Sequence, residues 1–261
     1  MTQGSISDLF TYPIKGLSRQ RLESVELTKG VGFPHDRICG FALHDSGFDP
    51  AAPAPLAKHH FLMLMRDEQL ARLDTHFDPD TRQLEISDQG STVLRADMSD
   101  ENGQRGAEEF FRLMFDLPPE QAPKFVTADP HRFTDVSVVS AELMNAVSLM
   151  NLASVKAFGD QIEAEVDPAR FRANIHFDGW PPFAELDLVG REIMIGAARA
   201  KITLRTKRCP ATEVNPSTAR RDMPLPRHLM SHYGHRDMGV YAEILEGGVL
   251  RPGDKISVLD S

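Results

Sequence analysis

Short strand-like runs, separated by turn residues, are the feature of this sequence that most restricts its fold. In residues 22–27 the apolar Leu22, Val25 and Leu27 are separated by polar residues, a pattern that we interpret as a half-buried strand. Further strand-like runs span 5–14, 37–43, 192–195, 201–206, 238–245 and 255–258. No strand–helix alternation and no glycine-rich phosphate loop is present. The sequence therefore predicts a mainly β fold, with a β-barrel or sandwich core and a few peripheral helices.

Helical spacing of apolar residues is confined to a few segments. We expect helices over 61–73, 106–115 and 140–148, the last one capped by Ser140. Residues 82–86 and 91–96 are predicted to pair as a hairpin, and 171–177 to form another strand. A domain boundary near 125–135 is only weakly marked, because no long linker lies there.

The composition limits the classes of function. With 29 basic and 38 acidic residues the chain has a net charge of −9, which argues against general nucleic-acid binding. The first residues resemble no signal peptide, and no apolar run is long enough to cross a membrane. We therefore expect a cytoplasmic protein with no membrane partner, in which Cys39 and Cys209 are free thiols. No cysteine or histidine spacing indicates zinc or an iron–sulfur cluster.

Cys209 lies at the end of an alternating run, next to Lys207 and Arg208. Pro210 cannot donate a ladder hydrogen bond, so the strand is expected to stop there and to leave the thiol in a loop. Adjacent positive charge favours the thiolate, which is the form that attacks electrophiles or binds metals. The alternative is a small buried residue without chemistry, because free cysteines are often buried. This segment alone does not decide between the two.

Three further clusters carry polar groups. Lys15 follows a strand and precedes Gly16, where a lysine is most often a solvated charge. Arg37 ends a His-Asp-Arg triplet that could be a surface rim or an anion clamp, since the guanidinium suits phosphate and carboxylate. If 171–177 is a strand, alternation places Arg170, Arg172 and Asn174 on one face. That face is either solvated or a polar wall of a binding site.

Together these fragments resemble one known family. They are Tyr12-Pro-Ile-Lys15, Asp36-Arg37, Arg170-Phe-Arg-Ala-Asn174, Arg208-Cys209, Gly239-Val-Tyr241 and Gly253-Asp254. In this order they are similar to the MOSC family, the molybdenum-cofactor sulfurase C-terminal domain proteins. The resemblance covers nearly the whole chain and is weakest over 46–130. It implies an N-terminal MOSC-associated β-barrel segment over 1–130 and a MOSC domain over 131–261, with a molybdopterin-type cofactor held between them.

The resemblance also implies roles for single residues. The cysteine that matches Cys209 ligates molybdenum or carries sulfur in cofactor-binding relatives. Lys15, Arg37 and Arg172 would bind the anionic phosphate, and Asn174, Thr206 and Arg208 would complete the cofactor site. Asp237 is a candidate proton donor near the substrate entrance. His35, Asp36 and Ser140 are weaker candidates, and His228, His232 and His235 are interpreted as a surface loop rather than a metal site. Gly16 replaces a serine that is common in the family.

Two functions follow as expectations. The first is a molybdenum-cofactor oxidoreductase that reduces N-hydroxylated small molecules, with electrons from a separate electron-donor protein. The second is a sulfur carrier, in which Cys209 accepts a persulfide from a sulfur donor and passes it to a partner. A member of the family that binds nothing is a third possibility. The retained Lys15 and Arg37 favour the first function.

Overall fold

The core of the molecule is a closed β-barrel that combines strands from both ends of the chain. The computed structural model describes residues 3–140 and 142–259. Seven strands follow the order β10, β9, β13, β12, β11, β15 and β1, and pairing of β1 with β10 closes the barrel. Their bounds are β1 Gln3–Thr11, β9 Val147–Asn151, β10 Ile175–Asp178, β11 Glu192–Ile195, β12 Ala198–Lys207, β13 Asp237–Glu246 and β15 Lys255–Val258. The mainly β prediction, with a barrel core, is confirmed.

Small and large residues face each other inside the barrel. In the antiparallel β12–β13 pair, Ala200 lies opposite Ile244 and Ile202 lies opposite Ala242. All four side chains are buried. Because successive residues of a strand point to opposite faces, alternate positions of both strands fill the interior. Placing a small residue opposite a large one lets the interior pack densely without voids.

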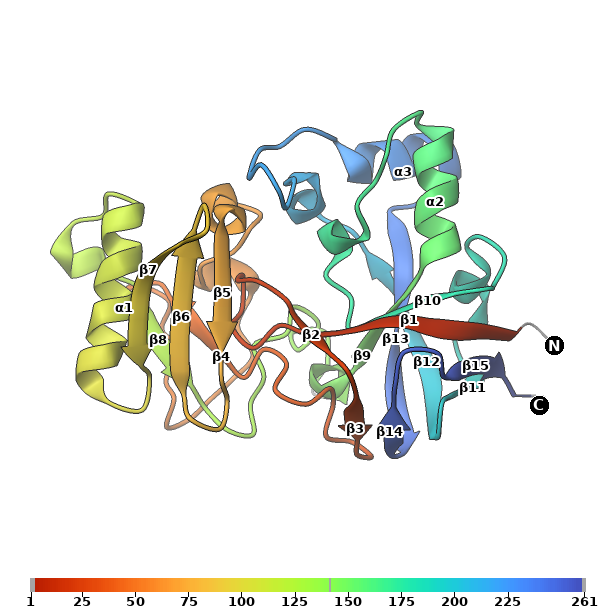
Figure 1. The fold of residues 1–261 in the computed structure, drawn as a ribbon, viewed down its shortest axis with the longest axis horizontal. Helices are drawn as coiled ribbons and strands as arrows, with labels where there is room; N and C mark the ends of the chain where they lie inside the picture. The colour runs from red at the N-terminus through yellow and green to blue at the C-terminus, as the bar shows by residue number, and fades with distance from the viewer. Residues whose placement is uncertain (1–2, 141, 260–261) are drawn as a thin grey trace.

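A second core lies in the N-terminal half, beside the barrel (Figure 1). It consists of the antiparallel strands β5 (Leu73–Phe77), β6 (Gln83–Asp88) and β7 (Ser91–Asp97), the pair β4 (Cys39–Ala42) and β8 (Lys124–Thr127), and helix α1 (Glu101–Met114). The carboxylate of Asp100 caps α1 by accepting from the backbone of Asn102 and Gly103. Phe41 packs on Phe111 with ring centroids 4.5 Å apart, which fixes the helix against the β4–β8 pair.

The remaining elements surround the barrel. Helices α2 (Leu152–Gln161) and α3 (Leu225–Tyr233) lie at one end of it in Figure 1. Strand β2 (Gln20–Leu22) extends the sheet from β1, and β3 (Val25–Leu27) pairs with β14 (Gly248–Leu250). The 3₁₀ segments are η1 Lys58–His60, η2 Glu68–Arg72, η3 Pro119–Gln121, η4 Glu142–Asn145, η5 Pro168–Phe171, η6 Ala184–Leu188 and η7 Pro210–Glu213. None of the described helices is both long and apolar enough to span a bilayer.

Several local predictions are confirmed and others are wrong. The hairpin of 82–86 with 91–96 is present as β6 and β7, and β11 and β15 have the predicted bounds. The helix predicted over 61–73 is wrong, because this segment holds η2 and then begins β5. Phe61, Leu62 and Met63 are all buried, and a helix could not bury three consecutive residues against one face.

The prediction of a helix over 140–148 also fails. Ser140 Oγ does accept from the backbone of Leu143, but only the short η4 follows, and β9 begins at Val147. Every residue of β9 is buried, because the strand pairs with β10 on one side and β13 on the other and is covered on both faces. A strand buried on both faces lacks the alternation that would have revealed it. Helix α2, which follows β9, was not predicted.

Candidate functional site

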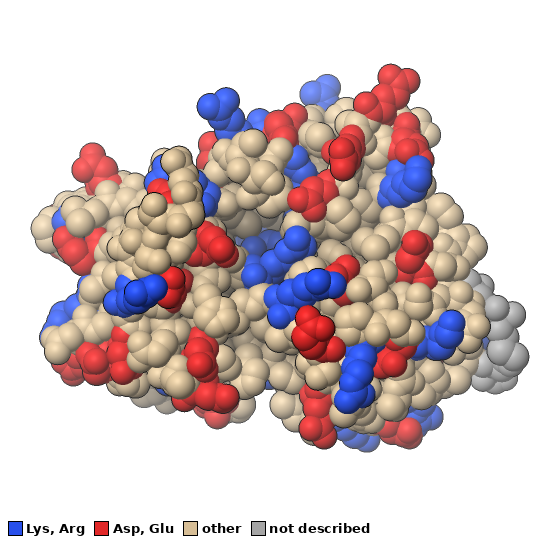
Figure 2. All heavy atoms as spheres, viewed as in Figure 1, with Lys and Arg blue, Asp and Glu red and all other residues tan. Residues whose placement is uncertain are grey.

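A cavity of about 830 Å³ lies between the barrel and the N-terminal half. Figure 2 shows a hollow between the two halves in which basic side chains gather. All eight of the principal site candidates from the sequence line this cavity: Lys15, Arg37, Arg172, Asn174, Thr206, Arg208, Cys209 and Asp237. The fold thus brings together residues from the first 40 positions, from positions 172–174 and from the last 60 positions of the chain. The role of each residue remains a prediction.

Cys209 lies two residues after the end of β12 and immediately before η7, and its side chain is half-buried. Its closest described polar partner is Lys58, whose Nζ donates to Sγ over 3.0 Å. The adjacent Lys207 is exposed, so the cation in contact with sulfur is not the neighbour in sequence. Sequence reasoning missed Lys58 because it lies 151 positions away, in η1, where no local pattern marks it.

Asp135 joins the two lysines of the cavity. Its carboxylate forms an ion pair with Lys15 and lies 3.6 Å from Lys58 Nζ. Lys15 also donates to the carbonyl of Phe133 over 2.9 Å. Burial lowers the pKa of Lys15, although Asp135 acts against this shift. Burial would raise the pKa of Asp135, but the two lysines outweigh it and hold this pKa below its ordinary value. Asp135 therefore stays a carboxylate that both ammonium groups share, and it offsets one of their two positive charges.

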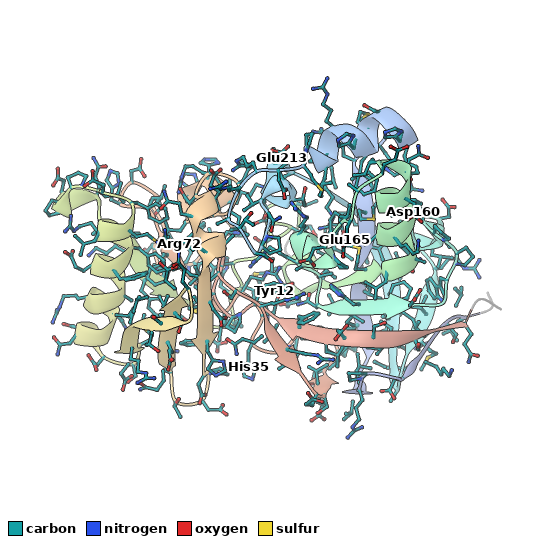
Figure 3. All side chains as sticks on the ribbon, turned by 45° about the horizontal axis from the view of Figure 1, so that its top comes forward. Tyr12, His35, Arg72, Asp160, Glu165 and Glu213 are labelled. Atoms are coloured by element: carbon teal, nitrogen blue, oxygen red, sulfur yellow. The ribbon has the colours of Figure 1, made fainter. Side chains whose placement is uncertain are left out.

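Tyr12 supports two arginines where the halves meet (Figure 3). The guanidinium carbons of Arg37 and Arg172 each lie 4.4 Å from the Tyr12 ring centroid. This is the geometry of cation–π contacts, and the aromatic ring lets two like charges share one region. Arg37 also forms an ion pair with Asp36, with 2.5 Å between Nη1 and Oδ2. The other carboxylate oxygen of Asp36 accepts a hydrogen bond from the backbone N–H of Tyr12. The Asp36 carboxylate therefore fixes the orientation of Arg37.

The backbone at both arginines is left-handed, with φ of 48° at Arg37 and 53° at Arg172. Residues other than glycine rarely adopt this conformation, and it is often retained at functional sites. The strand predicted over 171–177 is therefore wrong in its first half: η5 ends at Phe171, Arg172 turns, and β10 begins only at Ile175. Arg170 lines the cavity together with Arg172 and Asn174, but its guanidinium is paired with Asp222 over 2.7 Å.

Asn174 has no hydrogen-bonding capacity left for a ligand. Its Nδ2 donates to the Phe10 carbonyl and to Asp36, and its Oδ1 accepts from the Ser148 hydroxyl over 2.7 Å. An amide group can donate two hydrogen bonds, so both donors are used. The structure thus places Asn174 behind Asp36, where it positions the carboxylate that in turn holds Arg37.

Arg208 is likewise committed to the protein. Its buried guanidinium donates to the carbonyls of Met238 and Phe171, the latter over 2.8 Å. Burial lowers the pKa of Arg208 to about 10. These bonds connect the end of β12 to the start of β13 and to η5, so Arg208 fixes the loop that carries Cys209.

Two groups on the cavity wall lack partners in the part of the chain that the structure describes. The hydroxyl of Thr206 is buried and makes no hydrogen bond. The guanidinium of Arg172 contacts Tyr12 but takes part in no ion pair or hydrogen bond among the described residues. Burial, together with the nearby Arg37, lowers the pKa of Arg172 to about 10. A buried hydroxyl is almost always partnered, and the half-buried Arg172 guanidinium has donors that no described residue uses, so both groups are suited to a polar, anionic ligand.

The weaker candidates are less well placed. His35 and Ser140 are not among the residues that line the cavity, whereas Asp36 is. The loop predicted over 229–235 is wrong for most of its length, because α3 extends to Tyr233 and buries Leu225 and Leu229. His228 and His232 stack one turn apart on α3. No group of metal-binding side chains is found among the described residues.

Gly16 shows why a serine is absent from this position. Its φ is +84°, and a Cβ atom there would lie 2.8 Å from the carbonyl oxygen of Leu62. A side chain would therefore require the backbone to move. The local backbone excludes the serine that is common in the family, so any ligand contact at this position comes from backbone groups.

Comparisons with known proteins agree with this architecture. The family model described as MOSC domain matches residues 131–257, and that described as MOSC N-terminal beta barrel domain matches residues 3–128. Mitochondrial amidoxime-reducing component 1 of Xenopus laevis is 26% identical over 136 residues, which cover 48% of this chain. That match spans only 39% of the Xenopus protein.

Among solved structures, the YUAD protein from Bacillus subtilis is 13% identical, with a TM-score of 0.45 and coverage of 98% of this chain and 95% of that one. YiiM from Geobacillus stearothermophilus is 16% identical, with a TM-score of 0.35 and coverage of 44% of this chain and 54% of that one. On the two family models, which together account for nearly its whole length, the chain belongs to the MOSC family and carries the MOSC N-terminal beta barrel domain.

Proposed function

We propose that this chain binds a molybdenum cofactor in the cavity and reduces N-hydroxylated small molecules, with Cys209 as the metal ligand. The observation that carries the proposal is the convergence of a thiol, cations from both halves and an unpartnered hydroxyl on one cavity. The Xenopus relative is named as an amidoxime-reducing component, which supports the substrate class because an amidoxime is an N-hydroxylated amidine. That support is indirect, since the match covers less than half of either chain.

The residues of the cavity fit a phosphate-bearing cofactor. Arg172 has donors that no described residue uses, and the planar guanidinium matches a phosphate group. Lys15 and Arg37 would add positive charge from the N-terminal half, and Thr206 would supply one hydroxyl. Cys209 would provide a soft thiolate, the ligand type that suits a thiophilic metal. Asn174 and Arg208 would act indirectly: Asn174 holds Asp36 in place, and Arg208 holds the Cys209 loop in place.

When bound, such a cofactor supplies the two-electron and oxo-transfer chemistry of the reaction. The chain would bind and orient the substrate and exclude water from the cavity. Asp237 begins β13 and lines the same cavity, so its carboxyl group is placed to exchange a proton with a bound substrate. Electrons would come from a separate electron-donor protein.

The proposal is tested by the molybdenum and pterin content of protein purified from a host that makes the cofactor. Cys39→Ala is a matched control for Cys209→Ala, because Cys39 is buried in the other core, where burial raises its pKa to about 12. We expect about one molybdenum and one pterin per chain in the wild type and in Cys39→Ala, and loss of molybdenum in Cys209→Ala. Wild-type protein without molybdenum or pterin would contradict the proposal.

A sulfur carrier is the second candidate, and the contact of Lys58 with Cys209 favours it. An ammonium group 3.0 Å from Sγ can stabilise a sulfur anion, and the half-buried side chain leaves the sulfur accessible. This function would require a sulfur donor and an acceptor partner. Labile sulfur that is lost in Cys209→Ala, in protein without molybdenum, would support the carrier over the reductase.

A further inference from the structure

Apolar side chains line part of the cavity, beside its charged groups. Five side chains, which we call the apolar rim, line it from four separate segments: Met65, Val136, Val139, Val189 and Leu204. Met65 lies between η1 and η2, Val136 and Val139 precede η4, Val189 follows η6, and Leu204 lies in β12. Four separate segments therefore contribute apolar side chains to the cavity that Cys209 also lines.

Two residues of the rim are unusually exposed. Val139 is 64% and Val189 45% exposed, and Val138, next to Val139 in sequence, is 49% exposed. Other exposed apolar residues, such as Val93 on β7 and Leu113 on α1, lie on separate elements. Single exposed apolar residues are ordinary, but a cluster of them at a cavity mouth usually marks a binding site. The apolar rim is thus the part of the exposed apolar surface that is best explained as a binding site for a ligand.

The cavity has room for such a ligand. Its volume of about 830 Å³ lies within the usual range for sites that hold a cofactor or a drug-sized molecule. The cations, the unpartnered hydroxyl, Cys209 and Asp237 line the same cavity as the apolar rim. A substrate held by its apolar body at the rim would therefore lie in the cavity that also contains the thiol and the carboxylate.

We propose that the apolar rim binds the body of the substrate, so that the chain selects N-hydroxylated molecules with an alkyl or aryl body over small polar ones. This inference rests on the proposed function for the reacting group, but the rim itself follows from Val139, Val189 and their neighbours alone. Apolar burial is non-directional, so the rim would accept bodies of varied shape and discriminate mainly by apolar area.

The first test uses protein without cofactor and the uncharged fluorescent probe N-phenyl-1-naphthylamine, which joins a phenyl ring to a naphthalene ring. We expect saturable binding that weakens about tenfold or more in the double variant Val139→Asp, Val189→Asp, because two apolar contacts are lost. Val93→Asp is the matched control, since Val93 is as exposed as Val189 but lies on β7. It should leave the affinity unchanged. Circular dichroism confirms that each variant is folded.

Three outcomes would overturn the inference. The double variant could bind the probe as tightly as the wild type, or Val93→Asp could weaken binding equally. The third outcome would come from sedimentation velocity, which measures the oligomeric state. If the double variant changes the oligomeric state and leaves probe affinity intact, the rim is an interface between protein chains and not a substrate site.

The second test uses the cofactor-loaded protein and a series of N-hydroxylated amidines that differ by one methylene. We expect KM to fall about fourfold per added methylene, with little change in kcat, and the double variant to flatten this trend. Turnover without dependence on chain length would contradict the inference. If no member of the series is reduced while the probe results stand, the proposed reaction is wrong and the rim remains a site for apolar ligands.

Discussion

The two halves of the molecule contribute cations to the cavity in different states. In the N-terminal half, Lys15 and Lys58 both pair with Asp135, and Arg37 pairs with Asp36. In the barrel half, Arg208 donates only to backbone carbonyls, and Arg172 has no ion pair among the described residues. On the N-terminal side every named cation therefore contacts a carboxylate, although two carboxylates are shared among three cations, whereas neither arginine on the barrel side has an ion pair among the described residues.

This difference separates residues that stabilise the protein around the cavity from residues whose donors could bind a ligand. A buried cation that is unpaired is costly, which is why burial lowers the pKa of both Arg172 and Arg208 to about 10. An anionic ligand would remove this cost at Arg172, whose donors are free. At Lys15 and Lys58 the ligand would instead compete with Asp135. Arg172 should therefore contribute most to the binding free energy of an anionic ligand. The cations that are already paired mainly stabilise the walls of the cavity.

The largest effect is expected when a carboxylate is removed from the paired side. Asp36→Ala would leave Arg37 buried without its partner and would free the Tyr12 amide and Asn174, so we expect a loss of about 3–5 kcal/mol in the free energy of unfolding. Chemical denaturation measures it. Asp160→Ala removes the exposed Lys156–Asp160 pair and should cost less than about 0.5 kcal/mol. Equal losses in the free energy of unfolding in both variants would show that the buried Asp36–Arg37 pair contributes no more than an exposed pair.

Acid should weaken the barrel side first. His176 on β10 is buried and its Nε2 has no partner in the described structure. Burial, reinforced by Arg19, lowers its pKa from 6.5 to about 4. The unfolded chain therefore binds the proton first, and stability is lost as the pH falls from about 6.5 to about 4. The loss should total about 3 kcal/mol.

His176→Phe keeps a ring against Phe10 and removes this titration. Denaturation at about pH 7 and about pH 4.5 would then show a smaller difference in the variant than in the wild type. The ion pairs of Asp135 do not contribute in this range, because the pKa of Asp135 lies below its ordinary value of 3.8 and their stabilisation is lost only in stronger acid. Identical pH dependence in the variant and the wild type would show that His176 is not the responsible group.

The two barrel arginines should respond in opposite ways to removal. Arg208→Met leaves the Met238 and Phe171 carbonyls without partners, so we expect it to cost about 2 kcal/mol of stability. Arg172→Met breaks no described hydrogen bond and should change stability by less than about 1 kcal/mol. It should, however, weaken the binding of inorganic pyrophosphate about tenfold, as measured by calorimetry on cofactor-free protein. If Arg172→Met were the more destabilising variant, the division between holding and binding residues would be wrong.

The sequence predicts the parts of this site that follow from local pattern. The strand before Cys209 alternates, and Pro210 ends it, so the position of the thiol at a strand end could be predicted. The helix predicted over 106–115 is found within α1, which begins five residues earlier at Glu101. Of the three paired strands β5, β6 and β7, only β6 and β7 could be predicted. Strand β5 could not, because it directly follows η2 and lacks a turn signal before it.

What the sequence could not predict depends on distant contacts. Lys58 reaches Cys209 across 151 positions and Lys15 reaches Asp135 across 120, and no local periodicity encodes either contact. The left-handed backbone at Arg172 is equally hidden, because arginine has no preference for it and tertiary packing imposes it. The family resemblance indicated the residues of the cavity, but not that Asn174 and Arg208 are already committed to protein groups.

The central claim is that both halves of the chain hold one molybdenum cofactor with its metal at Cys209. Anomalous diffraction at the molybdenum edge, from crystals of the cofactor-loaded protein, tests it most directly. We predict a single anomalous peak in the cavity, within bonding distance of Cys209 Sγ and facing Arg172. A peak elsewhere, or none in crystals grown from protein with stoichiometric molybdenum, would contradict the account.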